Sequence, residues 1–236
     1  MTWAIIAIAA GVFFFVQPRS GQEAVEFLFE QATIPCEVAG FEPLTFDEIN
    51  TGECDIATES PEAFPDKNVA LSLIVAIFLH GGVMHLAGNL WILFIFGNNV
   101  EEDMGLVPYA AFYLVAGLAA SMGHVLIHID DTTPVVGASG AIAGVMGAYL
   151  VLHPKVRVVS IIPPLYFFPF KVPAALYLVV WFGLQFLLAN QDTNIAWEAH
   201  VIGFVVGVAA ALALRASGFV GRRRQRLDAR AAHREH

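Results

Sequence analysis

A serine between glycines opens a short apolar run, in the sequence Gly137-Ala138-Ser139-Gly140. A serine hydroxyl becomes the nucleophile of an acyl-transfer reaction when a histidine lies close enough to take its proton. The chain carries such a histidine, His200, just inside the start of a later apolar segment. Together these two residues would form a minimal activated nucleophile. The alternative is that the serine is only one more small residue that serves helix packing.

An acyl-transfer site also needs hydrogen-bond donors for the oxyanion that develops at the attacked carbonyl. The backbone N–H of Ser139 is one candidate, because the first N–H groups of a helix have no partner within it. His85 and Asn89 are four residues apart and would share one helical face, and both can donate to an anionic oxygen. Polar side chains in apolar segments are costly, which favours a functional role for this pair. For His80 we favour an interhelical hydrogen bond over chemistry.

Two further histidines, His124 and His128, are also four residues apart and lie late in an apolar segment. Such a pair could bind a metal ion, which proteins hold with histidine together with cysteine or a carboxylate. The sequence gives no sign of a carboxylate or cysteine that would converge on the pair. We therefore expect an interfacial role for both histidines and no metal site.

The composition places these residues in a membrane protein. Hydrophobic residues make up 57% of the 236-residue chain and charged residues only 14%, a balance far from that of a soluble domain. The net charge of -9 is segregated along the chain, and no basic surface would suit nucleic acid. We therefore expect an all-α, multi-pass protein whose surroundings are the lipid bilayer.

Six apolar segments are expected to form the membrane helices. The first could instead be a cleaved secretory signal, but it lacks the basic start and the small-residue cleavage site of one. The fourth would be roughly 22 Å long as a helix, shorter than the hydrocarbon core of about 30 Å, so other helices must surround it. The six segments are residues 2–16, 80–96, 107–127, 138–152, 172–189 and 197–214.

The connecting segments are polar or interrupted. An outer loop over about residues 18–79 is strongly acidic, because residues 21–66 hold twelve Asp or Glu and no Lys or Arg. Residues 98–105, with three acidic side chains, predict a turn. The apolar run 158–170 is broken by prolines and is not expected to span the membrane.

The distribution of Lys and Arg predicts the orientation of the chain. Six spans put both termini on one side, and the connections of that side hold every Lys and Arg except Arg19 and Lys67. By the positive-inside rule the termini are cytoplasmic and the acidic loop is outside. If the compartment outside is oxidising, Cys36 and Cys54 could form a disulfide, which we favour over two unpaired thiols. Residues 1–214 would then be one membrane domain, followed by a basic, flexible tail over residues 215–236.

This topology makes the fourth and sixth segments parallel helices that both begin at the outer face. Small residues recur every four positions in each of them, at Gly140 and Gly144 in one and at Gly203 and Gly207 in the other. Such seams let two helix backbones approach closely. Packing and topology therefore bring the serine and the histidine to a similar depth and into close range.

Three segments resemble the signature segments of the rhomboid intramembrane serine proteases, in the family's order and on the expected helices. Any one of them alone would be weak evidence, but the three together are specific. The resemblance covers about residues 80–207 and implies a six-helix bundle with a short central fourth helix. The segments are His80-Gly-Gly-Val-Met-His85-Leu-Ala-Gly-Asn89, Gly137-Ala138-Ser139-Gly140 and Ala199-His200-Val-Ile-Gly203-Phe-Val-Val-Gly207.

The resemblance implies a Ser–His dyad, with Ser139 as nucleophile and His200 as general base. It implies an oxyanion hole made by the Ser139 N–H, His85 and Asn89. Substrates would be single-pass or other transmembrane proteins cut near the outer membrane boundary, with no metal or cofactor. We expect a bacterial plasma membrane, with the active site open to the extracytoplasmic side. Supporting positions would be Gly137, Gly140, His80 and Gly203.

Two features depart from the family pattern. Ala143 stands where some members carry an aromatic residue that stacks on the catalytic histidine, so His200 must be oriented in another way. The outer loop lacks the Trp-Arg pair of several members, so it cannot be matched residue by residue.

The sequence argues against two other functions. A non-catalytic relative that binds transmembrane helices would generally lack the serine or the histidine, and both are present here. A small transporter with a histidine-lined path would be expected to show two matching broken helices, which the chain does not.

Overall fold

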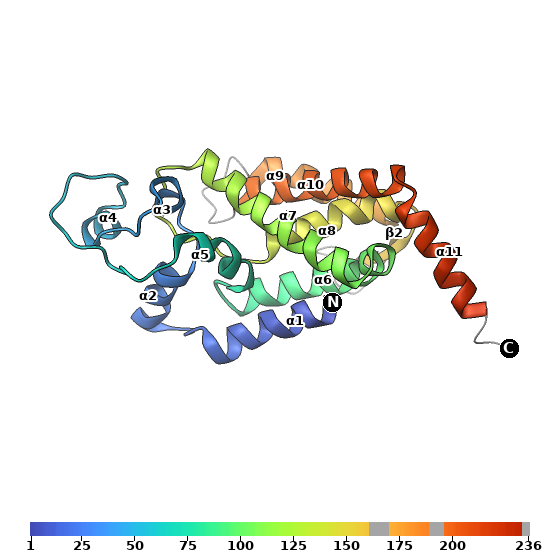
Figure 1. The fold of residues 1–236 in the computed structure, drawn as a ribbon, viewed down its shortest axis with the longest axis horizontal. Coiled ribbons are helices and arrows are strands. Elements are labelled where there is room, and N and C mark those ends of the chain that lie inside the picture. Colours follow the sequence, from blue (N-terminus) through green and yellow to red (C-terminus); the bar gives the residue numbers. More distant parts are fainter. Residues whose placement is uncertain (161–169, 189–195, 233–236) are drawn as a thin grey trace.

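Apolar helices run along the long axis of the molecule, with the small helices of the outer loop at one end and the C-terminal helix at the other (Figure 1). This computed structural model describes residues 1–160, 170–188 and 196–232. The helices are α1 (Thr2–Gly11) with its π-helical continuation η1 (Val12–Val16), α2 (Gly21–Gln31), α3 (Pro35–Gly40), α4 (Phe46–Thr51), α5 (Val69–Val75) with the 3₁₀ turn η2 (Ala76–Phe78), α6 (Val83–Met104), α7 (Leu106–Ile127), α8 (Ser139–Leu152), α9 (Ala174–Leu188), α10 (Trp197–Ala216) and α11 (Phe219–Ala232).

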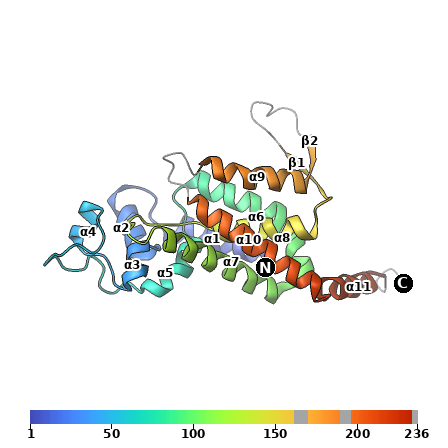
Figure 2. The ribbon, with the colours of Figure 1, turned by 90° about the horizontal axis from the view of Figure 1, so that it is seen from above.

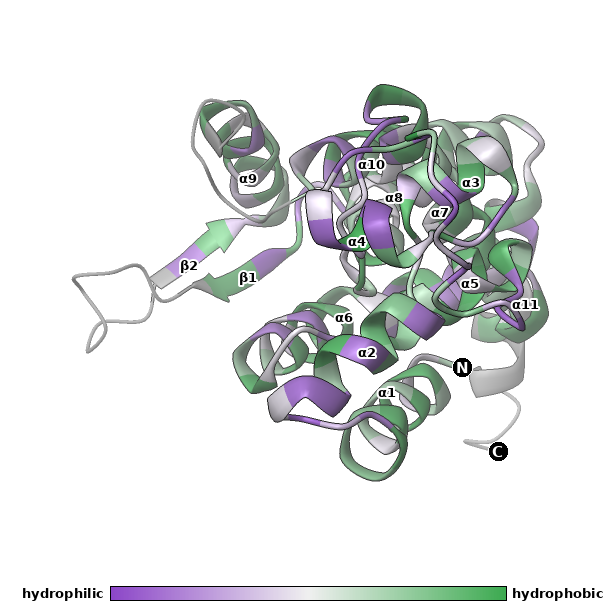
Figure 3. Cartoon of the chain, turned by 90° about the vertical axis from the view of Figure 1, so that its left-hand side faces the viewer, coloured by the Kyte–Doolittle hydropathy of each residue, from purple (hydrophilic) through white to green (hydrophobic). Residues whose placement is uncertain are grey.

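In the described residues, three helices are long and apolar enough to cross a bilayer, namely α6, α7 and α10. Shorter apolar helices cover Thr2–Val16, Val69–Phe78, Ser139–Leu152 and Ala174–Leu187. Many large apolar side chains on these helices face outward, among them Trp91, Val115 and Leu212. The end-on view shows hydrophobic helix surfaces around the bundle and hydrophilic residues on α2 and α4 (Figure 3). Such outward apolar faces are expected where lipid is the solvent.

Helix α8 forms the centre of the bundle (Figure 2). Every residue from Gly140 to Tyr149 is buried, and α8 packs on α6, α7, α9 and most extensively on α10. The expected short helix inside a ring of others is therefore present, and it begins one residue later than predicted. Its tight surroundings explain the glycines at positions 140, 144 and 147, where a Cβ would lie 2.1–2.7 Å from atoms of α7 or α10.

The outer loop is a folded unit. A disulfide joins Cys36 in α3 to Cys54 after α4, across 5.9 Å between the two Cα atoms. A buried ion pair joins Glu37 to Lys67. The Val135 N–H donates to the Thr33 carbonyl at 2.7 Å, which attaches the loop to the segment that leads into α8.

The expected turn at residues 98–105 is wrong. Helix α6 continues to Met104, and the chain breaks only at Gly105, which has a φ of +90°. Two of the three acidic side chains have partners from elsewhere in the chain, which stabilises the helical end. The Glu101 carboxylate accepts the Thr2 N–H at 2.7 Å, and Asp103 accepts from Arg224 Nε at 2.6 Å.

The expectation of a flexible tail is also wrong for residues 215–232. Helix α10 continues to Ala216, and after a corner at Gly218 (φ +70°) the basic residues form α11. Arg224 on α11 binds Asp103 on α6, so tertiary contact accounts for the order of this helix.

Two short strands depart from the all-α expectation. β1 (Arg157–Ser160) and β2 (Phe170–Pro173) pair antiparallel, with Arg157 opposite Pro173. They lie in the connection that was not expected to span the membrane. Most of the proline-broken run 158–170 and the expected end of the fifth span at Ala189 lie outside the described residues.

Candidate active site

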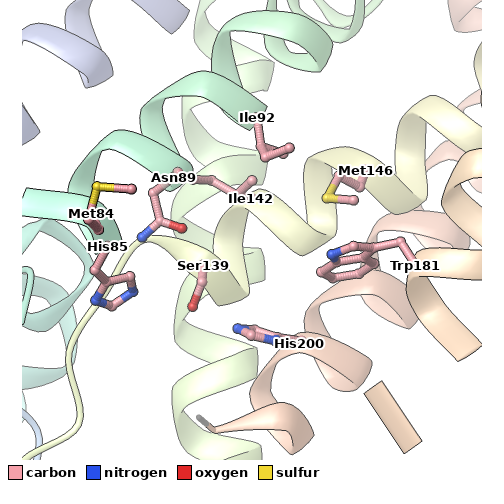
Figure 4. A pocket seen from close by; sticks show the side chains of 10 residues that line it. Met84, His85, Asn89, Ile92, Ser139, Ile142, Met146, Trp181 and His200 are labelled. Carbon is pink, nitrogen blue, oxygen red and sulfur yellow. The ribbon is translucent and has the colours of Figure 1, made fainter. Parts of the chain in front are cut away.

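The residues to which the sequence assigns chemistry line one cavity of about 270 Å³ (Figure 4). His85 and Asn89 come from α6, Ser139 from the start of α8 and His200 from the first turn of α10. The remaining lining is apolar. It consists of Met84, Gly88, Ile92, Ile142, Met146 and Trp181.

Ser139 is half-buried and is the first residue of α8. Its backbone N–H belongs to the first turn, where N–H groups have no partner within the helix and the helix dipole favours negative charge. The preceding loop is held by a hydrogen bond from the Gly137 N–H to the Ala76 carbonyl at 2.9 Å. Gly137 has a φ of +123°, and a Cβ there would lie 2.8 Å from Cε1 of His85. Glycine is therefore required at position 137 for both conformation and space.

The imidazole of His200 is anchored from α9. Its Nδ1 lies 2.7 Å from Oε1 of Gln185, whose amide Nε2 donates to the Trp181 carbonyl at 3.1 Å. Because Gln185 Oε1 can only accept, the network assigns the proton of the neutral imidazole to Nδ1. Nε2 is then left with a lone pair that can take a proton.

Trp181 gives His200 an aromatic neighbour. The two rings are 5.9 Å apart between centroids, at an interplanar angle of 38°. Trp181 on α9 thus supplies an aromatic neighbour for His200 that Ala143 on α8 does not. Sequence reasoning missed both Gln185 and Trp181, although a single amide in an otherwise apolar helix was a usable signal for Gln185.

Ser139 and His200 face each other within the cavity (Figure 4). Among the described residues no hydrogen bond joins them, and Nε2 of His200 stays free because Gln185 occupies Nδ1. In unliganded enzymes catalytic hydrogen bonds are often long and tighten only when substrate is bound. The arrangement therefore fits a nucleophile and its base before substrate binding.

His85 and Asn89 line the α6 side of the cavity. The Gly81 N–H approaches Nδ1 of His85 at 3.4 Å, which makes that nitrogen an acceptor and leaves the ring proton on Nε2. Nδ2 of Asn89 is buried and has no hydrogen-bond partner in the described part of the chain. Both side chains thus offer a free donor close to Gly137 and Ser139.

His80 lies behind the cavity rather than in its lining. It is fully buried, and its ring packs edge-on against His85 with 5.3 Å between centroids. Gln17 holds its backbone, donating to the His80 carbonyl at 2.6 Å and accepting the His80 N–H at 3.1 Å. The imidazole itself makes no interhelical hydrogen bond among the described residues, because Nδ1 lies 3.2 Å from the Phe78 carbonyl and the buried Nε2 has no partner.

The glycine seams bring α8 and α10 into backbone contact. A Cβ at Gly203 would lie 2.1 Å from the Gly140 carbonyl oxygen, and one at Gly207 would lie 1.9 Å from that of Gly144. No side chain can be accommodated at these distances. The first turn of α10 is thereby held beside the start of α8.

The expectation that no carboxylate converges on His124 and His128 is wrong. A carboxylate does converge on them, that of Glu198 in the first turn of α10, with 2.9 Å between its Oε1 and Nε2 of His128. The sequence did not reveal it because seventy residues separate the two segments.

Comparison with known proteins shows which chains this one is similar to. The rhomboid domain profile matches residues 67–217. RHOMBOID-like protein 5 of Arabidopsis thaliana is 38% identical over 78 residues, 33% of this chain and 25% of that protein. Rhomboid protease GluP of Bacillus subtilis (strain 168) is 30% identical over 185 residues, 75% of this chain and 34% of GluP. The chain therefore spans only a quarter to a third of the length of these relatives.

The matched region contains α6, the start of α8, and α10, which carry all four polar residues of the cavity lining. It covers more than half of the chain. The chain is thus a membrane-embedded, multi-pass protein that belongs to the rhomboid family, whose members are generally intramembrane serine proteases.

Proposed function

We propose that the chain is an intramembrane serine endopeptidase with Ser139 as its nucleophile and His200 as its general base. The observation that carries the proposal is the shared cavity, in which hydroxyl and imidazole face each other and free donors lie on the α6 side. Membership of the rhomboid family supports it independently.

The expected reaction follows from the assigned tautomer. With the Nδ1 proton of His200 held by Gln185, Nε2 takes the proton of the Ser139 hydroxyl as Oγ attacks the scissile carbonyl. The imidazolium then gives that proton to the leaving amine, and the acyl group remains on Oγ. A water molecule, deprotonated by the same nitrogen, hydrolyses the ester and restores the hydroxyl.

The oxyanion of each tetrahedral intermediate needs donors that are in place beforehand. The Ser139 N–H, His85 Nε2 and Asn89 Nδ2 can supply them. The orphaned state of the Asn89 amide supports this role, since a buried donor without a partner is unfavourable until an acceptor arrives.

The substrates we propose are transmembrane segments of other membrane proteins. A cavity bounded by apolar helices and lined by Met84, Ile142 and Met146 suits an apolar chain. We propose that six segments span the membrane, namely residues 2–16 and helices α6, α7, α8, α9 and α10. Both termini would then be cytoplasmic. The active site would then open toward the extracytoplasmic side, close to the outer loop.

The test is cleavage of a model single-span substrate by the full chain in liposomes, together with fluorophosphonate labelling of the enzyme. Ser139→Ala and His200→Ala should each abolish both signals. Ser121→Ala and His153→Ala are matched controls outside the cavity and should retain them. Asn89→Ala should lower kcat by roughly 10²–10³-fold, as the loss of one oxyanion donor does elsewhere.

Cleavage at the wild-type rate by either dyad variant would refute the assignment. A wild-type chain that binds a transmembrane peptide but is neither labelled nor able to cut would favour the non-catalytic alternative.

A further inference from the structure

Three side chains of metal-ligating type meet outside the cavity, where α7 ends and α10 begins. Nε2 of His128 lies 2.9 Å from Oε1 of Glu198, and Nδ1 of His124 lies 3.5 Å from Oε2. One ligand atom from each residue lies within 4.8 Å of the other two. Two helices that are distant in sequence thus bring two imidazoles and one carboxylate to a single point.

Nδ1 of His124 makes no hydrogen bond with a described residue, although Oε2 of Glu198 lies 3.5 Å away. The side chain of His124 is 9% exposed, and this nitrogen is buried. The Glu198 side chain is equally buried. Buried polar atoms are nearly always bonded, so this nitrogen points to an additional bonding partner. The His128 side chain is 38% exposed and leaves a path from solvent.

We propose that His124, His128 and Glu198 bind a divalent transition-metal cation of the Zn²⁺ class. Imidazole and carboxylate are ligands for such a cation, and three protein ligands leave a fourth position for water. Tetrahedral coordination with bonds of about 2.0–2.2 Å places ligand atoms roughly 3.3–3.5 Å apart. Nδ1 of His124 is 3.5 Å from Oε2 and Nε2 of His128 is 2.9 Å from Oε1 of Glu198, so side-chain rotations that let one cation replace these direct contacts would complete the site.

The cation would join the end of α7 to the start of α10, two residues before His200. Its effect would be to hold the first turn of α10 in position. The site requires no participation of Ser139, so binding is expected equally in Ser139→Ala. Metal binding and proteolysis can therefore succeed or fail separately in experiment.

The experiment uses the full chain, purified with a tag that contains no histidine and stripped with a chelator. Co²⁺ titration should give the visible absorption bands of a tetrahedral site at one equivalent, and Zn²⁺ should displace it. Zn²⁺ should also raise the midpoint of thermal aggregation. Glu198→Gln, which keeps the side-chain shape, should abolish the bands and the shift. It should weaken Zn²⁺ binding by more than the roughly 10–100-fold cost of losing an outer-shell partner.

Matched controls separate this site from other histidines. His85→Ala tests binding in the cavity, His153→Ala tests the cluster at Asp103, and a double His233→Ala/His236→Ala variant tests the end of the chain. All three should bind as the wild type does. Unaltered binding in Glu198→Gln, or loss of binding in one of the controls alone, would assign the metal elsewhere and overturn the proposal.

A spectroscopic readout keeps the test decisive if the variants fold poorly. X-ray absorption of the Zn²⁺-loaded wild type should show two imidazole ligands. A spectrum with one imidazole or none would overturn the site. Failure of the chelator-stripped wild type to bind Zn²⁺ or Co²⁺ would also overturn the metal site. The three side chains would then form only an interhelical hydrogen-bond cluster.

Discussion

Gln185 on α9 and His200 on α10 are joined by a hydrogen bond of 2.7 Å between Oε1 and Nδ1. The Gln185 side chain is buried and is itself held by the Trp181 carbonyl. A Ser–His dyad has no third member to orient its base. In addition, Ala143 stands where some members of the family carry an aromatic residue that stacks on the histidine. This amide therefore has the geometry of an orienting group, which fixes both the ring and its tautomer.

Replacing Gln185 by Leu should lower kcat with little change in KM. The imidazole would lose the acceptor that keeps its proton on Nδ1, so fewer molecules would present a basic Nε2 to Ser139. General-base catalysis contributes about 10²–10⁴-fold, and we expect a loss of roughly 10–100-fold because the base itself remains. Steady-state cleavage and the rate of fluorophosphonate labelling measure this effect.

The matched control is Gln185→Glu, which keeps an acceptor oxygen at the same place. It should recover most of the labelling rate, which a purely structural role of the amide would not predict. Equal kcat values for wild type and Gln185→Leu would show that His200 is oriented by its other contacts, such as Trp181.

A second prediction concerns the backbone contact between α8 and α10. Gly207→Ala would place a methyl group 1.9 Å from the Gly144 carbonyl oxygen, and a helix backbone cannot move aside as a side chain can. Overpacking of this kind costs about 1–3 kcal/mol or more. The midpoint of thermal aggregation and the cleavage rate should both fall, because α10 carries His200.

Gly183→Ala on α9 provides the control. A Cβ at that position meets nothing within 4 Å. The change should be neutral or stabilising by up to about 1 kcal/mol, since alanine favours a helix over glycine. If Gly207→Ala and Gly183→Ala had the same midpoint of thermal aggregation, α8 and α10 could move apart without a loss of stability.

The seam itself was predictable because its glycines recur every four residues and helix geometry places such residues on one face. The short α8 followed from the length of its apolar run, and the seam together with the expected topology placed Ser139 near His200. What the sequence could not give were the partners of isolated polar residues. Gln185 has no periodic signal, and its role depends on how α9 packs against α10.

The errors at Asp103 and in the tail have a common physical cause. Local composition predicts a turn from clustered acidic residues and disorder from clustered basic ones. In the fold an ion pair joins the two clusters, because Asp103 binds Arg224. Charge complementarity between segments 121 residues apart cannot be detected from either segment alone.

A third prediction concerns the buried ion pair of the outer loop. The side chains of Glu37 and Lys67 are each 1% exposed, and Lys67 also donates to the Phe29 carbonyl at 2.6 Å. Lys67→Met would leave the Glu37 charge buried without its partner, which costs about 3–5 kcal/mol. Hydrogen–deuterium exchange in α3 should therefore accelerate.

The double variant Glu37→Gln/Lys67→Met removes both charges and should restore most of the protection. Single and double variants that exchange equally fast would mean that the loop depends on the Phe29 contact rather than on the charge pair.

The pH dependence of Lys67→Met has a definite sign. Burial raises the pKa of Glu37 above 4.5, and the Lys67 ammonium opposes this rise. Without the ammonium the pKa of the folded-state carboxyl lies higher still. A raised folded-state pKa gives stability that is complete below pH 4.5 and is lost as the pH rises through the raised value. After correction for intrinsic exchange, α3 should be better protected in acid than at neutral pH, and Glu37→Gln should remove the difference.

The last prediction concerns the docking of α11. Arg224 donates through Nε to Asp103 at 2.6 Å, and the Asp103 side chain is only 4% exposed. Arg224→Gln would leave that carboxylate with His153, 2.9 Å away, as its remaining side-chain neighbour among the described residues. Loss of one partner of a buried group costs roughly 1–3 kcal/mol, so hydrogen–deuterium exchange in α11 should accelerate.

Arg222→Gln is the control on the same helix, because Arg222 has no side-chain hydrogen bond to a described residue. Labelling of Ser139 should be unchanged in both variants, since α11 lies at the end of the molecule far from the outer loop (Figure 1). If exchange in α11 were the same in Arg224→Gln as in the wild type, the buried Val220 would have to hold the helix instead.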